Sequence, residues 1–158
     1  MRKLLTWIGA AALITLIVGV PGFGYLAWVA SGLDNEGRIY SDQATIAVVQ
    51  HWNAAALKDR ASPELLASIK PDQLASLFHW FGTLGALKSV APCSGQVNVN
   101  VTIVSGRTTS GQFTCNAKFE SGDATVSLLI FKNQGKWQIA GFRVNSPALI
   151  PREQGGKT

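Results

Sequence analysis

Charge is absent from a long stretch near the amino terminus. No Asp, Glu, Lys or Arg lies between Lys3 and Asp34, so residues 4–33 could enter a bilayer without burying an ion. Of the 14 basic side chains, Arg2 and Lys3 precede this stretch, which leaves 12 against 9 acidic ones. These 12 are scattered singly and form no basic stripe, whereas a nucleic-acid-binding protein needs a concentrated basic face. We therefore exclude nucleic acid as a partner.

Cysteine is scarce, since Cys93 and Cys115 are the only two. Neither lies near the end of the apolar segment, which excludes a lipoprotein anchor. Both lie in the part of the chain that we expect outside the cytoplasm, and an even number of cysteines in an oxidising compartment favours a disulfide. Such a bridge would stabilise the fold by roughly 3 kcal/mol in the chain-entropy model. The alternative is a pair of buried thiols that never join.

The apolar amino-terminal segment has two interpretations. It is nearly twice as long as the apolar region of a cleavable signal peptide, although Ala30-Ser31-Gly32 offers a cleavage site. Trp7 and Trp28 are 21 positions apart, which is roughly 31 Å of helix and close to the hydrocarbon thickness. Together with Tyr25, they are typical of aromatic residues at the two membrane interfaces. We predict a retained membrane helix over residues 1–32, with a cleaved signal and a free periplasmic domain as the alternative.

The flanking charges predict the orientation of this helix. Arg2 and Lys3 favour a cytoplasmic amino terminus, while Asp34 and Glu36 follow on the other side. The expected location is therefore a bacterial inner membrane, crossed once, with the carboxyl-terminal domain in the periplasm. That exported part is expected to comprise a short linker over residues 33–41, a compact domain over residues 42–147 and a flexible tail over residues 148–158.

Apolar periodicity in the exported part predicts helices first and strands second. Helical spacing begins at Asp42, and the prolines after Ser62 and Lys70 suit first helical turns, so we expect about three helices. From Leu84 onward the pattern alternates, as in QVNVNVTIV and GQFTCNAKFE, which predicts a sheet with one solvated face. Short turns predict a meander. The fold class is α+β: a membrane helix, then about three helices packed on a curved five-stranded antiparallel sheet.

The last predicted strand, KWQIAGFRVNS, contains an irregularity. Its apolar residues change from odd to even positions at Ala140-Gly141, which predicts a β-bulge. With this bulge, Arg143 points to the solvated face of the sheet. Without it, Arg143 would point toward the core.

Three segments of the chain resemble a known superfamily: VVQHWNAAL, FGTLGALKSV and the terminal GKWQIAGFRVNS. With the order of elements, they look like the nuclear transport factor 2-like, cystatin-like cone, and in particular its small exported bacterial domains of uncharacterised function. The resemblance covers about residues 40–147 and rests mostly on packing residues. It implies a pocket beneath the sheet, where enzymes of this superfamily place an acid or base.

The sequence offers little for catalysis in such a pocket. No Asp or Glu falls on an inward strand position, and the only histidines, His51 and His79, each lie beside a tryptophan. We expect a non-catalytic binding or accessory domain, without a metal or cofactor, whose partner is an envelope protein or a small apolar ligand. The alternative is a small isomerase or hydrolase that uses one of these histidines as its base. The expected pocket lining is aromatic: Trp52, Phe78, Phe81, Phe131 and Trp137.

Overall fold

The computed structural model describes residues 32–102 and 106–150 of the chain. The predicted membrane helix, with its interfacial residues Trp7, Tyr25 and Trp28, lies outside these ranges. Within them, no helix has both the length and the apolarity needed to cross a bilayer. The described part is α+β, as predicted, with four α-helices that precede a five-stranded antiparallel sheet.

The first described helix covers residues 32–49. It is followed by α2 (Ala54–Lys58), α3 (Pro63–Ser68), α4 (Pro71–Phe81) and the 3-10 turn η1 (Gly82–Leu84). Local chemistry sets the starts of the short helices: the Asn53 side chain accepts from two amides of α2, and the Ser62 hydroxyl accepts from the amide of Leu65. Proline occupies the first turn of α3 and α4, as the sequence predicted.

Two helix boundaries were predicted wrongly. Residues 33–41, expected to be a linker, are helical and belong to the 32–49 helix. The single helix expected from Asp42 onward is broken near Trp52, whose φ of 47° reverses the chain before α2 begins. Local sequence could not reveal the helical state of residues 33–41, because the contacts that stabilise this helix come from strands about sixty residues later in the chain.

The sheet has one long central strand and a divided edge. Its strands are β1 (Leu87–Val90), β2 (Ser94–Thr102), β3 (Gly106–Phe119), β4 (Asp123–Asn133) and β5 (Lys136–Asn145). β3, β4 and β5 form the predicted meander, but β1 and β2 do not pair with each other. Instead β2 pairs with the first part of β3 and β1 with its last residues. Pro92, which lacks an amide proton, lies in the interruption between these two halves of one edge.

The predicted bulge in β5 is confirmed. Leu129 pairs with Gly141 and the next residue, Ile130, pairs with Ile139, so Ala140 is the extra residue. Beyond the bulge, Arg143 is opposite Ser127 and is exposed on the face away from the core. The outer edge of β5 is partly covered by the chain before α3, because the amide of Ser62 donates to the carbonyl of Ile139 (2.8 Å).

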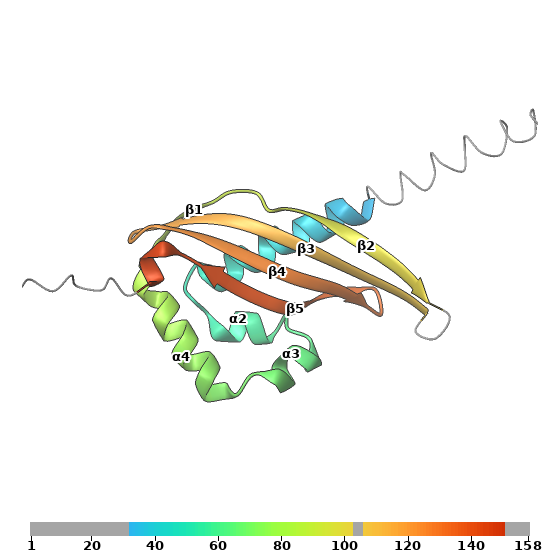
Figure 1. Ribbon diagram of the computed structural model, residues 1–158, viewed down its shortest axis with the longest axis horizontal. Coiled ribbons are helices and arrows are strands. Elements are labelled where there is room, and N and C mark those ends of the chain that lie inside the picture. The colour runs from blue at the N-terminus through green and yellow to red at the C-terminus, as the bar shows by residue number, and fades with distance from the viewer. Residues whose placement is uncertain (1–31, 103–105, 151–158) are drawn as a thin grey trace, which may run out of the picture.

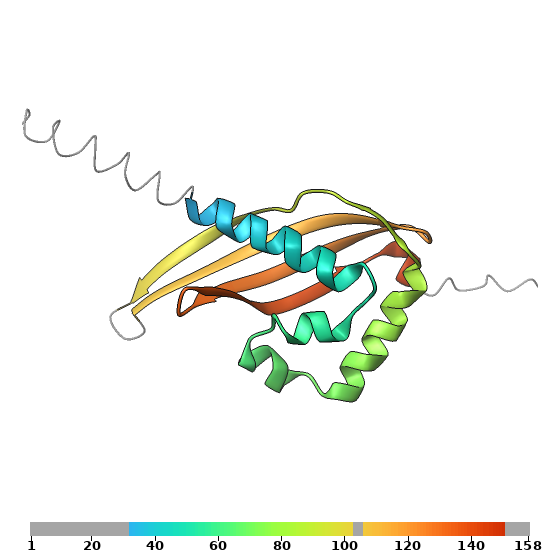
Figure 2. The same cartoon turned by 180° about the vertical axis from the view of Figure 1, so that it is seen from behind.

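The two faces of the sheet differ. The 32–49 helix lies along one face, here called the helix-covered face (Figure 2), while Figure 1 looks onto the opposite, open face. α2, α3 and α4 lie beside β5. The core between helices and sheet includes Val48, Leu57, Phe78, Phe113 and Ile130.

The compact fold continues beyond residue 147, where the flexible tail was expected to begin. The 3-10 turn η2 (Pro147–Leu149) follows β5, and Leu149 is buried in the core. The Ser146 hydroxyl fixes this turn, since it donates to the carbonyl of Asp123 (2.6 Å) and accepts from the amide of Ala148 (3.2 Å).

Candidate functional site

Two carboxylates hold the 32–49 helix against the edge of β2. Asp34 accepts a hydrogen bond from the amide of Val97 (2.6 Å), and Asp42 accepts one from the amide of Cys93 (2.7 Å). The eight-residue interval from Asp34 to Asp42 spans about 12 Å of helix, and the four-residue interval from Cys93 to Val97 spans about 13 Å of extended chain. Because these lengths match, both carboxylates can reach the same strand edge at once. The helix thus satisfies backbone amides that an edge strand would otherwise leave open.

Close approach of this helix to the sheet depends on Gly37. A Cβ atom at this position would lie 2.8 Å from Cγ2 of Val97 and 3.0 Å from the ring of Phe113. Any side chain here would therefore push the helix away from the strands. Gly37 is therefore required for packing, although a glycine within a polar segment such as residues 33–41 is also typical of a linker.

An ion pair joins the same helix to the far strands. The Lys132 ammonium donates to the Glu36 carboxylate and lies 5.4 Å from the centre of the Trp137 ring. The hydrogen bond from Lys132 holds the pKa of Glu36 below its ordinary value. One turn further along the helix, burial raises the pKa of Tyr40, whose hydroxyl donates to the carbonyl of Arg60 (3.4 Å).

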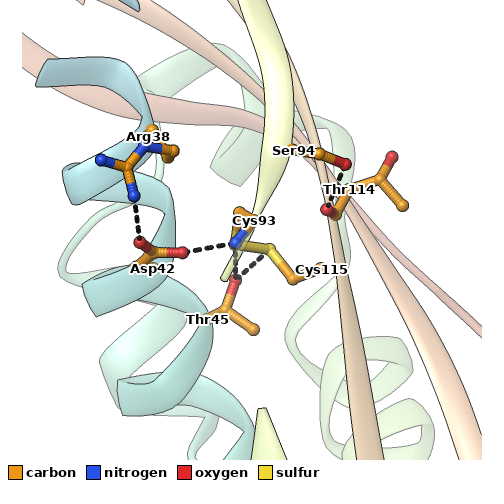
Figure 3. Close-up of a disulfide and its surroundings, with 7 residues drawn as sticks. All are labelled: Arg38, Asp42, Thr45, Cys93, Ser94, Thr114 and Cys115. Atoms are coloured by element: carbon orange, nitrogen blue, oxygen red, sulfur yellow. Dashed lines mark hydrogen bonds and ion pairs between the residues drawn. A yellow bond between two sulfur atoms is a disulfide. The ribbon is translucent and has the colours of Figure 1, made fainter. Parts of the chain in front are cut away.

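Cys93 and Cys115 form the predicted disulfide (Figure 3). Their Cα atoms are 4.2 Å apart: Cys115 lies on β3, and Cys93 comes directly before Ser94, the first residue of β2, which pairs with Thr114. Both are almost fully buried, with 2% and 0% exposure. The Thr45 hydroxyl of the 32–49 helix lies 3.2 Å from the sulfur of Cys115, so the helix covers the bridge.

Three of the five aromatic residues predicted to line a pocket pack against one another at the core, and two of them, Trp52 and Phe78, also line an open hollow. The Trp52 ring lies 5.3 Å from that of Phe81 and 5.1 Å from that of Phe119, and Phe78 lies 6.0 Å from Phe81. Phe78 and Phe81 are 6% and 8% exposed. They fill space between α4 and the sheet.

The other two predicted lining residues lie elsewhere. Trp137 is opposite Lys132 on the helix-covered face, whereas Phe131 alternates with buried Ile130 and therefore lies on the open face. The structure does not gather the five aromatic residues in one cavity.

The two histidines lie at the surface. His51 and His79 line one open hollow of about 680 Å³, together with Gln50, Trp52 and Thr83. Both imidazoles are exposed, and no carboxylate lines this hollow. A histidine base would therefore lack an acidic partner to orient it. In the described part of the chain, no three His, Cys, Asp or Glu side chains gather as a metal site would require.

The structure shows an apolar surface on α3 and α4 that was not predicted from the sequence. Leu66, Leu77 and Trp80 are 42%, 42% and 45% exposed. A hollow of about 620 Å³ runs along α4 and is lined by Ile69, Leu77 and Trp80, and a smaller one of about 190 Å³ lies between α2, α3 and α4. We call Leu66, Ile69, Leu77 and Trp80 the α3–α4 patch.

The α3–α4 patch arises because α4 is apolar on two sides. Leu74, Phe78 and Phe81 face the core, while Leu77 and Trp80, three residues apart, point to solvent. Leu77 fits the same helical spacing as Leu74, Phe78 and Phe81, which by itself predicts a single apolar stripe. The exposed Trp80 beside it was the signal that could have revealed a second one.

No protein-family model, curated protein or solved structure matches this chain. The resemblance to the nuclear transport factor 2-like cone therefore stays a prediction. What the structure shows is the coarser agreement, namely helices that precede and pack on an antiparallel sheet.

Proposed function

We propose that this chain is a membrane-anchored, extracytoplasmic domain that catalyses no reaction and binds an envelope protein through the α3–α4 patch. The observation that carries the proposal is the exposure of Leu66, Leu77 and Trp80 beside two adjoining hollows. Contiguous apolar patches are uncommon on monomeric soluble proteins and mark interaction sites. Tryptophan is also enriched among the residues that dominate binding energy at interfaces.

Two features support the extracytoplasmic location. The uncharged stretch over residues 4–33 suits a membrane anchor, and the buried Cys93–Cys115 disulfide suits an oxidising compartment. No long linker separates the apolar segment from the folded domain, because Asp34, the first charged residue after that segment, accepts a hydrogen bond from Val97 of β2. An anchored domain would therefore be held close to the bilayer surface, with α3 and α4 on the side away from the start of the 32–49 helix (Figure 2).

Site-specific photocrosslinking in native membranes tests the binding proposal. A photoreactive residue at Leu77 of the intact chain should give one light-dependent protein adduct, whereas the same residue at exposed Asn116 on the open face should not. Equal adducts from both positions, or none from Leu77, would contradict the proposal. Mass spectrometry of the mature amino terminus separates the anchor, which keeps residues 1–32, from a cleaved signal, which leaves a chain beginning at Leu33.

A small pocket enzyme is the second candidate, favoured by the shared hollow of His51 and His79. Turnover of model esters or enolisable ketones by the intact chain would support it if His51→Gln or His79→Gln abolished that turnover. Turnover that both variants retain, or none at all, would remove this candidate.

A further inference from the structure

The open face of the sheet carries amides and hydroxyls in place of charges. From Ser94 to Asn100 on β2 and from Thr108 to Asn116 on β3, every outward position is Ser, Thr, Asn or Gln. The next outward positions, Thr125 and Ser127 on β4, continue the pattern. About a quarter to a third of an ordinary soluble surface is charged. The charge-free part of the face, over residues 94–100, 108–116 and 125–127, is therefore a distinctive surface.

A hollow of about 470 Å³ adjoins this surface where β5 bulges. It is lined by Gln112, Thr114 and Ser127 from the polar strands and by Leu129, Gly141 and Arg143 at its other side. Gly141 keeps it open, since a Cβ atom there would already lie 3.3 Å from Cβ of Leu129. No carboxylate lines the hollow, and within the described residues Arg143 forms no ion pair.

An apolar ledge borders the same hollow. Leu129 is 41% exposed, and Phe131, two residues further along β4, is half-buried on the same face. The surface thus combines amides and hydroxyls, a small apolar ledge and one arginine. Polyhydroxylated ligands use this combination, because their hydroxyls pair with amides while their ring C–H faces pack on apolar side chains. The planar guanidinium adds a bidentate donor for a carboxylate.

We propose that the open face binds a glycan strand that bears carboxylates. A sugar ring lies over Leu129 and Phe131, its hydroxyls pair with Gln112 and Ser127, and its carboxylate pairs with Arg143. The charge balance favours this occupant over others, because nucleic acids and anionic membranes require several cations, and the core of a protein interface is richer in aromatic side chains. The site is on a different surface from the α3–α4 patch and does not depend on it.

The test titrates the intact, ¹⁵N-labelled chain in detergent micelles with tetragalacturonate, and separately with neutral chitotetraose and with acetate. Tetragalacturonate should shift the amide resonances of residues 112–114, 127–129 and 141–143. Arg143→Gln should weaken its binding roughly tenfold or more, as expected for loss of a charge-assisted pair. Lys118→Gln, which removes another outward cation outside the hollow, is the matched control and should bind as the original chain does.

Gly141→Ala narrows the hollow and should also weaken binding. Its melting temperature checks the fold, and Ser127→Ala provides a second variant if Gly141→Ala does not fold. Equal affinity of Arg143→Gln and the original chain would overturn the proposal, as would equal affinity for chitotetraose. Shifts confined to another surface, an equal response to acetate, or no shift at millimolar tetragalacturonate would overturn it as well.

Discussion

At Gly37, one hydrogen atom in place of a methyl group determines how closely a helix approaches the sheet. Gly37→Ala places Cβ 2.8 Å from Val97 and 3.0 Å from Phe113. Such crowding costs about 1–3 kcal/mol, and the better helix propensity of alanine offsets about 1 kcal/mol of it. We expect a net loss of unfolding free energy in urea titrations. Gly32→Ala, with nothing within 4 Å of its new Cβ, should be neutral or stabilising, and equal effects of the two changes would contradict this account.

Glu36 gives the fold a small pH dependence. Its pKa is lowered by the hydrogen bond from Lys132, so the folded state favours the ionised carboxylate. This stabilisation is present above the ordinary glutamate pKa of about 4.3 and is lost as the pH falls through the lower, folded value. The Glu36 side chain is 55% exposed, so the contribution is below about 1 kcal/mol. Glu36→Gln should lower the free energy of unfolding at pH 7 but leave it unchanged near pH 2, and an equal loss at both would refute the assignment.

The disulfide joins Cys93 to Cys115 on β3, and the 32–49 helix covers this bridge. The bridge joins residues 22 apart, for which the chain-entropy model gives about 3 kcal/mol of stabilisation. Cys93→Ala with Cys115→Ala should lower the unfolding free energy by about that amount. In the native protein, the sulfurs should react with a reductant only when the helix opens, so thiol labelling should accelerate in Gly37→Ala. Labelling at the same rate in both proteins would contradict the protective role of the helix.

On α4, the two apolar sides should respond differently to substitution. Phe78→Ala leaves a cavity in the core and should cost about 3–5 kcal/mol of stability. Trp80→Ser alters the exposed side, so its cost should be well below that of Phe78→Ala, while the photocrosslinked adduct formed from a photoreactive residue at Leu77 should disappear. Thermal denaturation and adduct yield measure the two effects separately. A patch that stabilised the fold and bound nothing would give a different result, namely a large loss of stability on Trp80→Ser and no adduct from Leu77 in either protein.

Elements with strong local signals were predictable from the sequence. Alternating apolar residues predicted the strands, the parity change at Ala140-Gly141 predicted the bulge, and proline predicted the starts of α3 and α4. The helical state of residues 33–41 was not predictable, because it depends on contacts with β2 and β3. The same limitation explains why the five aromatic residues do not line one pocket as predicted. Their size was evident from the sequence, but only the register of β4 places Phe131 on the open face.

The whole molecule should depend on its 32–49 helix for solubility. β2 has no charged residue of its own, and charges are the usual protection of an edge strand. A chain that begins at Gln43 loses both Asp34 and Asp42 and leaves the amides of Cys93 and Val97 open. We expect it to aggregate, whereas a chain that begins at Leu33 should elute as a single species in gel filtration. Equal solubility of the two chains would show that the helix is dispensable.

The position of this helix in the sequence also affects the order of events during biosynthesis. Asp42 and Asp34 precede the amides they bind by 51 and 63 residues, so the ribosome completes the helix before β2 exists. Chains are generally organised from the amino terminus during synthesis. The helix that covers β2 is therefore present when β2 is synthesised. The time during which the uncovered edge of β2 could pair with another chain is short.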